Sequence, residues 1–308
     1  MMGRGVRWLI ILLVAACTRV EEPPCEVSVT LLAPAPHTRS GDPDESLVTD
    51  CNLFIYNQFG LLEKKVYVPR REYPGGAISV QARLVKESPY TVLAAANLGY
   101  ELNFGSLEEA LSYRYHMAYP DEFSQGIPMS AAVEEAVAGN DARIEVPLER
   151  LMSRVDLRVD RRALNEDVSI RITSVQVSNA ASSVLLFGES RVEQWSHLFT
   201  EGYSKTGQDL YNLNHDALDG ISGTVALYLL ESGPGGLVEP YIEVKADYHS
   251  STCHTRPGEP LVYRFYITDN NQGTQRNALY PIILKPTGTG LECPDGWRLE
   301  KGALVTAF

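Results

Sequence analysis

Short runs of alternating apolar and polar residues recur along most of this chain and constrain its fold more than any other feature. In Leu151–Asp160, for example, Val155, Leu157 and Val159 alternate with charged residues. Successive side chains of a β-strand point to opposite faces, so this spacing is typical of strands with one buried face and one wet face. Turn residues separate the runs at short intervals, as in β-sandwiches and barrels. The sequence therefore predicts an all-β fold.

Two segments depart from the strand period. Ser106 can cap a helix and Glu109 completes a capping box, which predicts a short helix over Leu107–Tyr113. A helical turn is expected within Val192–Leu198, and a slip of phase near Thr173-Ser174 predicts a β-bulge. The predicted strands are Glu26–Leu32, Cys51–Asn57, Leu62–Val68, Ile78–Val85, Tyr90–Ala96, Ile127–Val133, Ala142–Leu148, Leu151–Asp160, Val168–Ser178, Val184–Phe187, Thr224–Leu230, Tyr241–Tyr248, Leu261–Thr268, Leu279–Leu284, Trp297–Leu299 and Ala303–Phe308.

The length of the chain predicts more than one domain. Its 308 residues exceed what one hydrophobic core usually serves. Glu149-Arg150 ends one group of predicted strands and leads directly into the next. We therefore place a boundary at about Arg150 and predict two tandem β-sandwich domains with a few short helices, over residues 25–150 and 151–308.

The first seventeen residues predict export and a lipid anchor. Two arginines precede the apolar run Trp8–Val14, which is too short to span a bilayer, and small residues follow, as in a secretory signal. Val14-Ala15-Ala16-Cys17 resembles a bacterial lipobox. That motif implies that the signal peptide, residues 1–16, is removed and that Cys17 carries diacylglycerol on its thiol and a chain such as palmitate on its amino group. The alternative is an ordinary secretory signal that happens to end in cysteine.

Residues 17–24 are predicted to form an extended tether between the lipid and the fold. They are polar and end in Pro23-Pro24, which favours an extended chain. Glu21 and Glu22 also resemble the surface-export tag of lipoproteins from gut and oral anaerobes. A solvated linker without that role is the alternative.

The net charge of the chain narrows the class of partner. Without residues 1–16 the formal charge at pH 7 falls from −12 to −14, which argues against a nucleic-acid partner.

After Cys17, four cysteines remain: Cys25, Cys51, Cys253 and Cys293. An even number in an exported chain can form disulfides, with three connectivities. The simplest pairs Cys25 with Cys51 and Cys253 with Cys293.

No motif predicts catalysis, which needs a nucleophile with a base, paired carboxylates in a cleft or a metal cluster. Asp247, His249, Cys253 and His254 are four potential metal ligands, but the second, distant pair that zinc sites favour is absent. We interpret them as a strand end followed by a loop with a disulfide cysteine. The prediction is a protein that is not an enzyme, with no metal and no cofactor.

Three further features have simple structural interpretations. Asp269–Gly273 lacks the spaced carboxylates of a calcium loop and predicts a turn. Ser232–Gly236 joins two strands with no helix after it to receive phosphate, so it is interpreted as a flexible hairpin loop. The 16 tyrosines could stack against sugars, but tyrosine is more often a strand residue with its ring in the core and its hydroxyl wet.

Five short stretches follow one another in an order that resembles a known family. The first two are an apolar and aromatic strand, Cys51–Asn57, and a strand that runs from tyrosine to Ala-Asn, Tyr90–Asn97. A Pro-Met-Ser element, Ile127–Ser130, and a segment across the predicted boundary, Val146–Val155, follow. The last is an aromatic strand, Tyr263–Asn271, which precedes Arg276-Asn277 and Tyr280. With the lipobox and acidic tether, they resemble the FimB-type fimbrial anchor subunits of the fimbrillin superfamily. Cys253 and Cys293 depart from that pattern.

The resemblance implies transthyretin-like β-sandwich domains in a lipoprotein of the outer membrane, exposed at the cell surface as part of a fimbrium. Fimbrial subunits of this kind join by strand addition, so the implied partner is a fimbrillin subunit. The chain would attach a fimbrium to the membrane through the lipid on Cys17 and could limit fimbrial length. The alternative function is a surface lipoprotein that binds a glycan or another host ligand through a sandwich face; a secreted hydrolase is a third.

Overall fold

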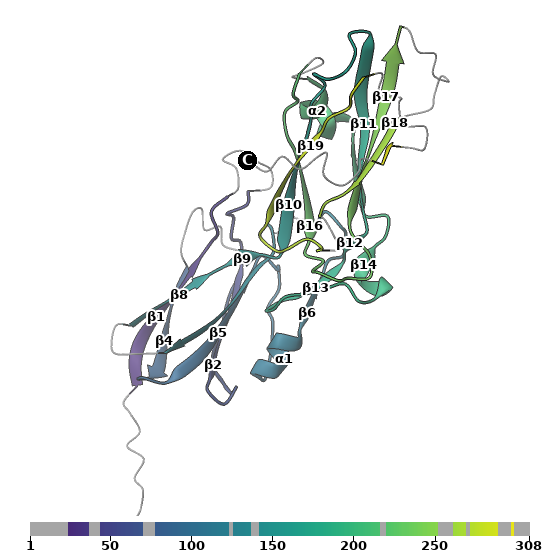
Figure 1. Ribbon diagram of the computed structural model, residues 1–308. Helices are drawn as coiled ribbons and strands as arrows, with labels where there is room; N and C mark the ends of the chain where they lie inside the picture. Colours follow the sequence, from purple (N-terminus) through teal and green to yellow (C-terminus); the bar gives the residue numbers. More distant parts are fainter. Residues whose placement is uncertain are drawn as a thin grey trace, which may run out of the picture.

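The computed structural model describes residues 24–36, 44–69, 78–122, 126–136, 142–215, 220–251, 261–268, 272–288 and 297–298. Strands dominate these residues, which confirms the predicted all-β class. Two pairs of β-sheets, one from each half of the chain, lie end to end (Figure 1). No helix of the described part is long and apolar enough to cross a membrane.

The N-terminal half forms a three-stranded sheet facing a five-stranded sheet. The smaller sheet has the order β4 (Ile78–Val85), β1 (Pro24–Leu32), β8 (Ala142–Pro147), with β1 antiparallel to β4 and parallel to β8. The larger has the order β3 (Leu62–Val68), β2 (Cys51–Asn57), β5 (Pro89–Ala96), β7 (Met129–Ala136), β9 (Glu149–Arg150).

The C-terminal half forms two five-stranded sheets. One has the order β14 (Leu198–Phe199), β12 (Ala180–Ala181), β16 (Val225–Leu230), β10 (Met152–Val159), β19 (Leu279–Leu284). The other has the order β15 (Tyr203–Thr206), β11 (Val168–Ser178), β17 (Tyr241–Ser250), β18 (Leu261–Tyr266), β20 (Trp297–Arg298). The predicted bulge is confirmed, because the β11–β17 register shifts between Ile172 and Ser174.

Short elements lie at the junction and at the edges. Among the named strands, one pair joins the two halves: β6 (Arg114–His116) is antiparallel to β13 (Ser183–Leu185). The helices of the described residues are α1 (Leu107–Ser112), α2 (Tyr211–His215) and the 3-10 helices η1 (Trp195–His197) and η2 (Gly207–Leu210). The predicted helical turn within Val192–Leu198 corresponds to η1. The predicted strand Ala303–Phe308 lies outside the described residues.

Helix α1 begins where the sequence predicted. The Ser106 side chain accepts a hydrogen bond from the Glu109 backbone N–H at 3.2 Å, which satisfies one of the free donors of the first turn. The Glu109 carboxylate accepts from the Gly105 N–H at 2.7 Å, one residue before the position of an ideal capping box.

Three buried clusters hold the sheets together, and one of them spans the two halves. The N-terminal core lies between the first two sheets and includes Val29, Leu53, Val92 and Ile144; the C-terminal core includes Val155, Val177, Leu227 and Val244; the junction core includes Phe54, Leu93, Leu151 and Leu230. Strand β2 is buried on both faces, because Leu53 and Ile55 enter the N-terminal core while Phe54 and Tyr56 enter the junction core. The five-stranded N-terminal sheet is therefore the middle layer of the molecule near the junction.

Candidate interaction edge and inter-half junction

The predicted lipidation site, Cys17, lies outside the described residues, which begin with Pro24 at the start of β1. Cys253 and Cys293 also lie outside them. The lipid anchor and the Cys253–Cys293 pairing therefore stay predictions.

The structure does not form the expected Cys25–Cys51 disulfide. Both residues are free, buried thiols. Cys25 pairs with Leu84 and lies near Tyr90, at the start of β5, whereas Cys51 pairs with Ala96, at the end of β5. Six residues of strand separate these positions by roughly 20 Å, far beyond the span of a disulfide. Burial, with the Asp50 charge, raises the pKa of the Cys51 thiol to about 12, so this thiol is poorly reactive.

The candidate metal ligands do not form a cluster in the described structure. Asp247 and His249 lie on β17 opposite Arg171 and Ser169 of β11. Cys253 and His254 lie outside the described residues. The described part of the chain contains no group of three or more ligating side chains placed to hold a metal ion.

The glycine-rich stretch is a packed crossover, so its interpretation as a flexible hairpin was wrong. It joins β16 to β17, which belong to different sheets. The Ser232 and Gly233 N–H groups both donate to the Thr274 carbonyl, at 3.0 and 3.2 Å. Gly233 has a φ of +63°, and a Cβ there would lie 2.0 Å from the Ser190 carbonyl oxygen. The glycine is required because two backbones meet at this point.

Among the described strands, β4 forms one edge of the three-stranded sheet. Among the described strands only β1 pairs with it, whereas β8, at the other edge of this sheet, packs against β7. Ile78, Ala82 and Leu84 of β4 are buried in the N-terminal core, and Val80 is half-buried against it. Gln81 and the other alternate residues are exposed. A further strand beside β4 would therefore find backbone hydrogen-bonding groups and an apolar face together.

A buried carboxylate at the junction of the two halves binds two arginines. Glu45, in the segment before β2, forms an ion pair and hydrogen bond with Arg154 of β10 and accepts a hydrogen bond from the Tyr228 hydroxyl at 2.8 Å. Arg150 lies 3.8 Å from the same carboxylate and donates to the Asn277 side chain at 2.8 Å. Burial lowers the pKa of Arg154, but its hydrogen bonds to Glu45 and Asp156 outweigh this and raise it above its ordinary value. Arg154 therefore stays charged, and its ion pair with Glu45 ties both halves together.

Arg276 makes a second connection across the junction. Its guanidinium forms an ion pair with Glu231, with Nε 2.9 Å from Oε2. The same group donates to the Leu185 carbonyl at 3.0 Å and to the Ser130 hydroxyl of β7 at 3.3 Å. The sequence pattern marked Arg276-Asn277 only as a family-like turn. The sequence did not predict the roles of Glu45, Arg154, Tyr228 and Glu231. Their partners are distant along the chain, and no residue near them indicates such contacts.

A small polar depression lies beside the junction. Tyr100, Tyr115, His116 and Glu122 are among its lining residues, and its volume is about 270 Å³. Typical small-molecule sites enclose roughly 300–1,000 Å³, so this hollow is at the low end for ligand binding. Burial and the hydrogen bond with Tyr113 raise the pKa of the Tyr100 hydroxyl, which therefore stays neutral.

Comparisons with known proteins find structural similarity without sequence similarity. No protein-family model matches the sequence. No curated protein matches it by a sequence search. A crystal structure of a cell adhesion protein from Bacteroides eggerthii is similar, with a TM-score of 0.59, 12% identity and coverage of 94% of each chain.

Two fimbrial proteins of Porphyromonas gingivalis are similar to the same extent. The tip fimbrial protein Mfa3 has a TM-score of 0.57 and 12% identity, over 85% of this chain and 94% of that one. The fimbrilin FimA of strain W83 has a TM-score of 0.55 and 14% identity, over 88% of this chain and 92% of that one. At this identity the likeness concerns the fold, and it extends over both halves of the chain. The protein therefore has the tandem β-sandwich fold found in fimbrial and cell-adhesion proteins of Bacteroides and Porphyromonas.

Proposed function

We propose that this protein is a lipid-anchored fimbrial anchor or accessory subunit at the cell surface. It attaches a fimbrium to the outer membrane through acyl chains on Cys17 and limits the length of the fimbrium. The similar structures include a fimbrilin and a tip fimbrial protein, which supports a place in such an assembly. The lipobox-like segment before Cys17 supports the anchor role over that of a repeating shaft subunit.

The single observation that carries the proposal is the edge strand β4 in a fold shared with fimbrial proteins. A fimbrillin subunit supplies an extended segment beside β4, where backbone hydrogen bonds provide affinity. Val80, half-buried on the inner face of that edge, contacts the side chains of the added strand. No cofactor and no catalytic step are needed.

Deleting the gene and analysing the fimbriae tests the role. We expect fimbriae that detach from the cells and are longer than normal, and we expect the protein in membrane-associated fimbrial preparations. Mass spectrometry of the mature N-terminus should find acylated Cys17. Fimbriae of unchanged length and attachment in the deletion strain would contradict the anchor role.

A matched pair of substitutions on β4 tests strand addition. Val80→Lys places a charge on the inner face of the edge, where it opposes an incoming strand. Gln81→Lys adds the same charge to the exposed face of the next residue. We expect the first variant to lose co-purification with fimbrillin by about tenfold or more, because an unpaired charge in a contact of this kind costs over 1.4 kcal/mol. The second variant should bind normally; equal binding of both would exclude β4 as the acceptor.

The depression beside Tyr100 and Tyr115 favours a second candidate function, capture of a glycan or another host ligand. Aromatic and polar side chains in one hollow are typical of sugar contacts. Its small volume makes this the weaker proposal. Titration of surface glycans against the wild type and Tyr100→Ala separates the two functions, because the anchor role requires no such binding.

A further inference from the structure

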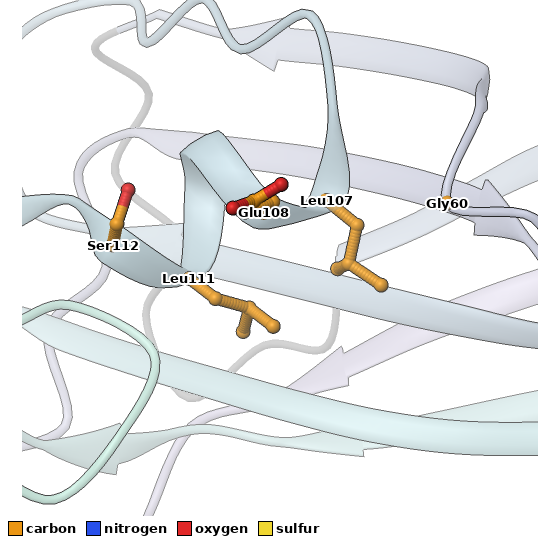
Figure 2. Close-up of a pocket in the computed structure, with 5 residues that line it drawn as sticks. All are labelled: Gly60, Leu107, Glu108, Leu111 and Ser112. Atoms are coloured by element: carbon orange, nitrogen blue, oxygen red, sulfur yellow. The ribbon is translucent and has the colours of Figure 1, made fainter.

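An exposed apolar patch lies where the β2–β3 turn meets helix α1. Phe59 and Leu61 belong to the β2–β3 turn and expose 73% and 59% of their surface; Leu111 of α1 exposes 41%. Together with the half-buried Leu107 they form what we call the end patch. Figure 2 shows Leu107 and Leu111 leaving α1 on the same side, beside Gly60, around a shallow depression.

The end patch is held rigid by backbone hydrogen bonds. The Leu107 N–H donates to the Gly60 carbonyl at 3.2 Å, and Leu61 forms a β-bridge with Ser106. Within the turn, the Phe59 N–H donates to the Asn57 side chain at 2.9 Å. Apolar side chains that are exposed to water are energetically unfavourable, and a cluster of them on a protein surface often marks a contact site.

The described chain begins at the same end of the molecule. Pro24 pairs with Val85, and the Val85 N–H donates to the Tyr90 hydroxyl at 2.8 Å. Tyr90 in turn pairs with Asn57, two residues before Phe59. In Figure 1 the start of β1, the outer end of β2 and α1 all lie at the lower end. Val85 is itself 41% exposed, which extends the apolar surface toward Pro24.

We propose that the end patch rests on the lipid surface to which the chain is anchored. This inference depends on the proposed acylation of Cys17. Seven residues of chain lead from Cys17 to Pro24, and they span at most roughly 25 Å. The bilayer is therefore held within reach of the end patch. A tethered contact is favoured by its high effective concentration, so four apolar side chains suffice for an interfacial contact that would be weak alone.

The charges around the end patch indicate an apolar rather than an electrostatic contact. Glu63, Lys64 and Glu108 flank it, and Glu101 is paired with Lys65 at 2.7 Å. Because acidic and basic groups are mixed, no attraction to anionic headgroups is expected, and the contact should be insensitive to salt. Resting on this end holds the N-terminal half against the membrane and directs the C-terminal half away from it.

Photocrosslinking of the mature, lipidated protein in vesicles tests the inference. The vesicles contain phosphatidylethanolamine, phosphatidylglycerol and a phospholipid with a photoreactive acyl chain. We expect lipid adducts on the peptides that contain Phe59 and Leu111, in low and high salt. Peptides with Trp195 or Leu237, which are exposed elsewhere, should carry none. Adducts equally frequent at Trp195 would overturn the proposal.

A substituted protein and a matched control complete the experiment. Phe59→Ser with Leu61→Ser should lower adduct formation at Leu111 about tenfold, because two of the apolar contacts are lost. Leu237→Ser, at a 44% exposed site, should leave it unchanged. A far-ultraviolet dichroism spectrum like that of the wild type shows that each variant is folded. If Cys17 is unmodified and the protein does not float with vesicles, the proposed anchor fails; if it floats and the end patch carries no adducts, only this inference fails.

Discussion

Glu45 shows how much one side chain contributes at the junction. Its carboxylate is buried with Arg154 and Tyr228 and lies near Arg150. Charges removed from water are stable only while their partners are present, so the contribution of such a cluster appears most clearly when one member is removed.

We predict that Glu45→Gln lowers the free energy of unfolding by about 3–5 kcal/mol, because it removes the ion-pair carboxylate of the buried Arg150 and one of the two carboxylates that pair with Arg154. Urea unfolding measures the change. Arg264→Gln is the control, since its pair with Glu243 lies at the surface, with 54% of the arginine side chain exposed. That change should be worth no more than about 1 kcal/mol. Equal losses in the two variants would contradict the assigned role of Glu45.

Asp160 predicts a pH dependence of stability. Hydrogen bonds from Arg162 hold the pKa of this carboxyl below its ordinary value of 3.8, although burial opposes them. A folded-state pKa below the unfolded value stabilises the protein fully above the unfolded pKa, and the contribution is lost as the pH falls through the folded pKa. Asp160→Asn should therefore destabilise the protein at pH 6 and flatten the decline of the urea midpoint below about pH 4. An unchanged decline would show that other carboxyls account for it.

At the scale of elements, the crossover from β16 to β17 depends on where its glycines lie. Gly233 and Gly235 both have positive φ, at +63° and +67°. A Cβ at Gly233 would overlap the Ser190 carbonyl, whereas one at Gly235 would meet nothing within 4 Å. Alanine substitutions at Gly235 and Gly233 therefore separate the cost of backbone strain alone from the added cost of steric overlap.

We predict that Gly235→Ala costs about 1–2 kcal/mol, the price of a left-handed conformation for an alanine. Gly233→Ala should cost about 1–3 kcal/mol more, because a neighbouring backbone must also move. Denaturant unfolding of the two variants gives the difference directly. Equal losses of stability in the two variants would mean that the backbone around Gly233 shifts readily to accommodate the added Cβ.

At the scale of the whole molecule, the junction core links the two pairs of sheets. Phe54 and Leu93 of the N-terminal half pack in the same cluster as Leu151 and Leu230. Three side-chain contacts also cross the junction: Glu45 with Arg154, Arg150 with Asn277, and Arg276 with Ser130. The two halves are therefore expected to unfold together.

We predict one unfolding transition in urea. Labelling of Cys25 and Cys51, followed by mass spectrometry, reports the N-terminal half because both thiols are buried there. Tryptophan fluorescence of the protein without residues 1–16 reports the C-terminal half, because Trp195 and Trp297 both belong to it, and should give the same midpoint. Separate midpoints would show that the halves unfold independently.

The sequence by itself determined the features that depend on near neighbours. The all-β class, the bulge before Ser174, the cap of α1 at Ser106 and most strand positions follow from alternation, phase and capping within a few residues. The candidate export signal that ends at Cys17 is also local, although it lies outside the described residues.

Only the tertiary structure decided which segments meet. It separated Cys25 from Cys51 by the length of β5, turned the presumed hairpin at Gly233 into a crossover between sheets, and left β4 as an edge. The Glu45–Tyr228 hydrogen bond joins positions 183 residues apart. Such contacts depend on how whole sheets pack, and residue spacing along the chain carries no record of that arrangement.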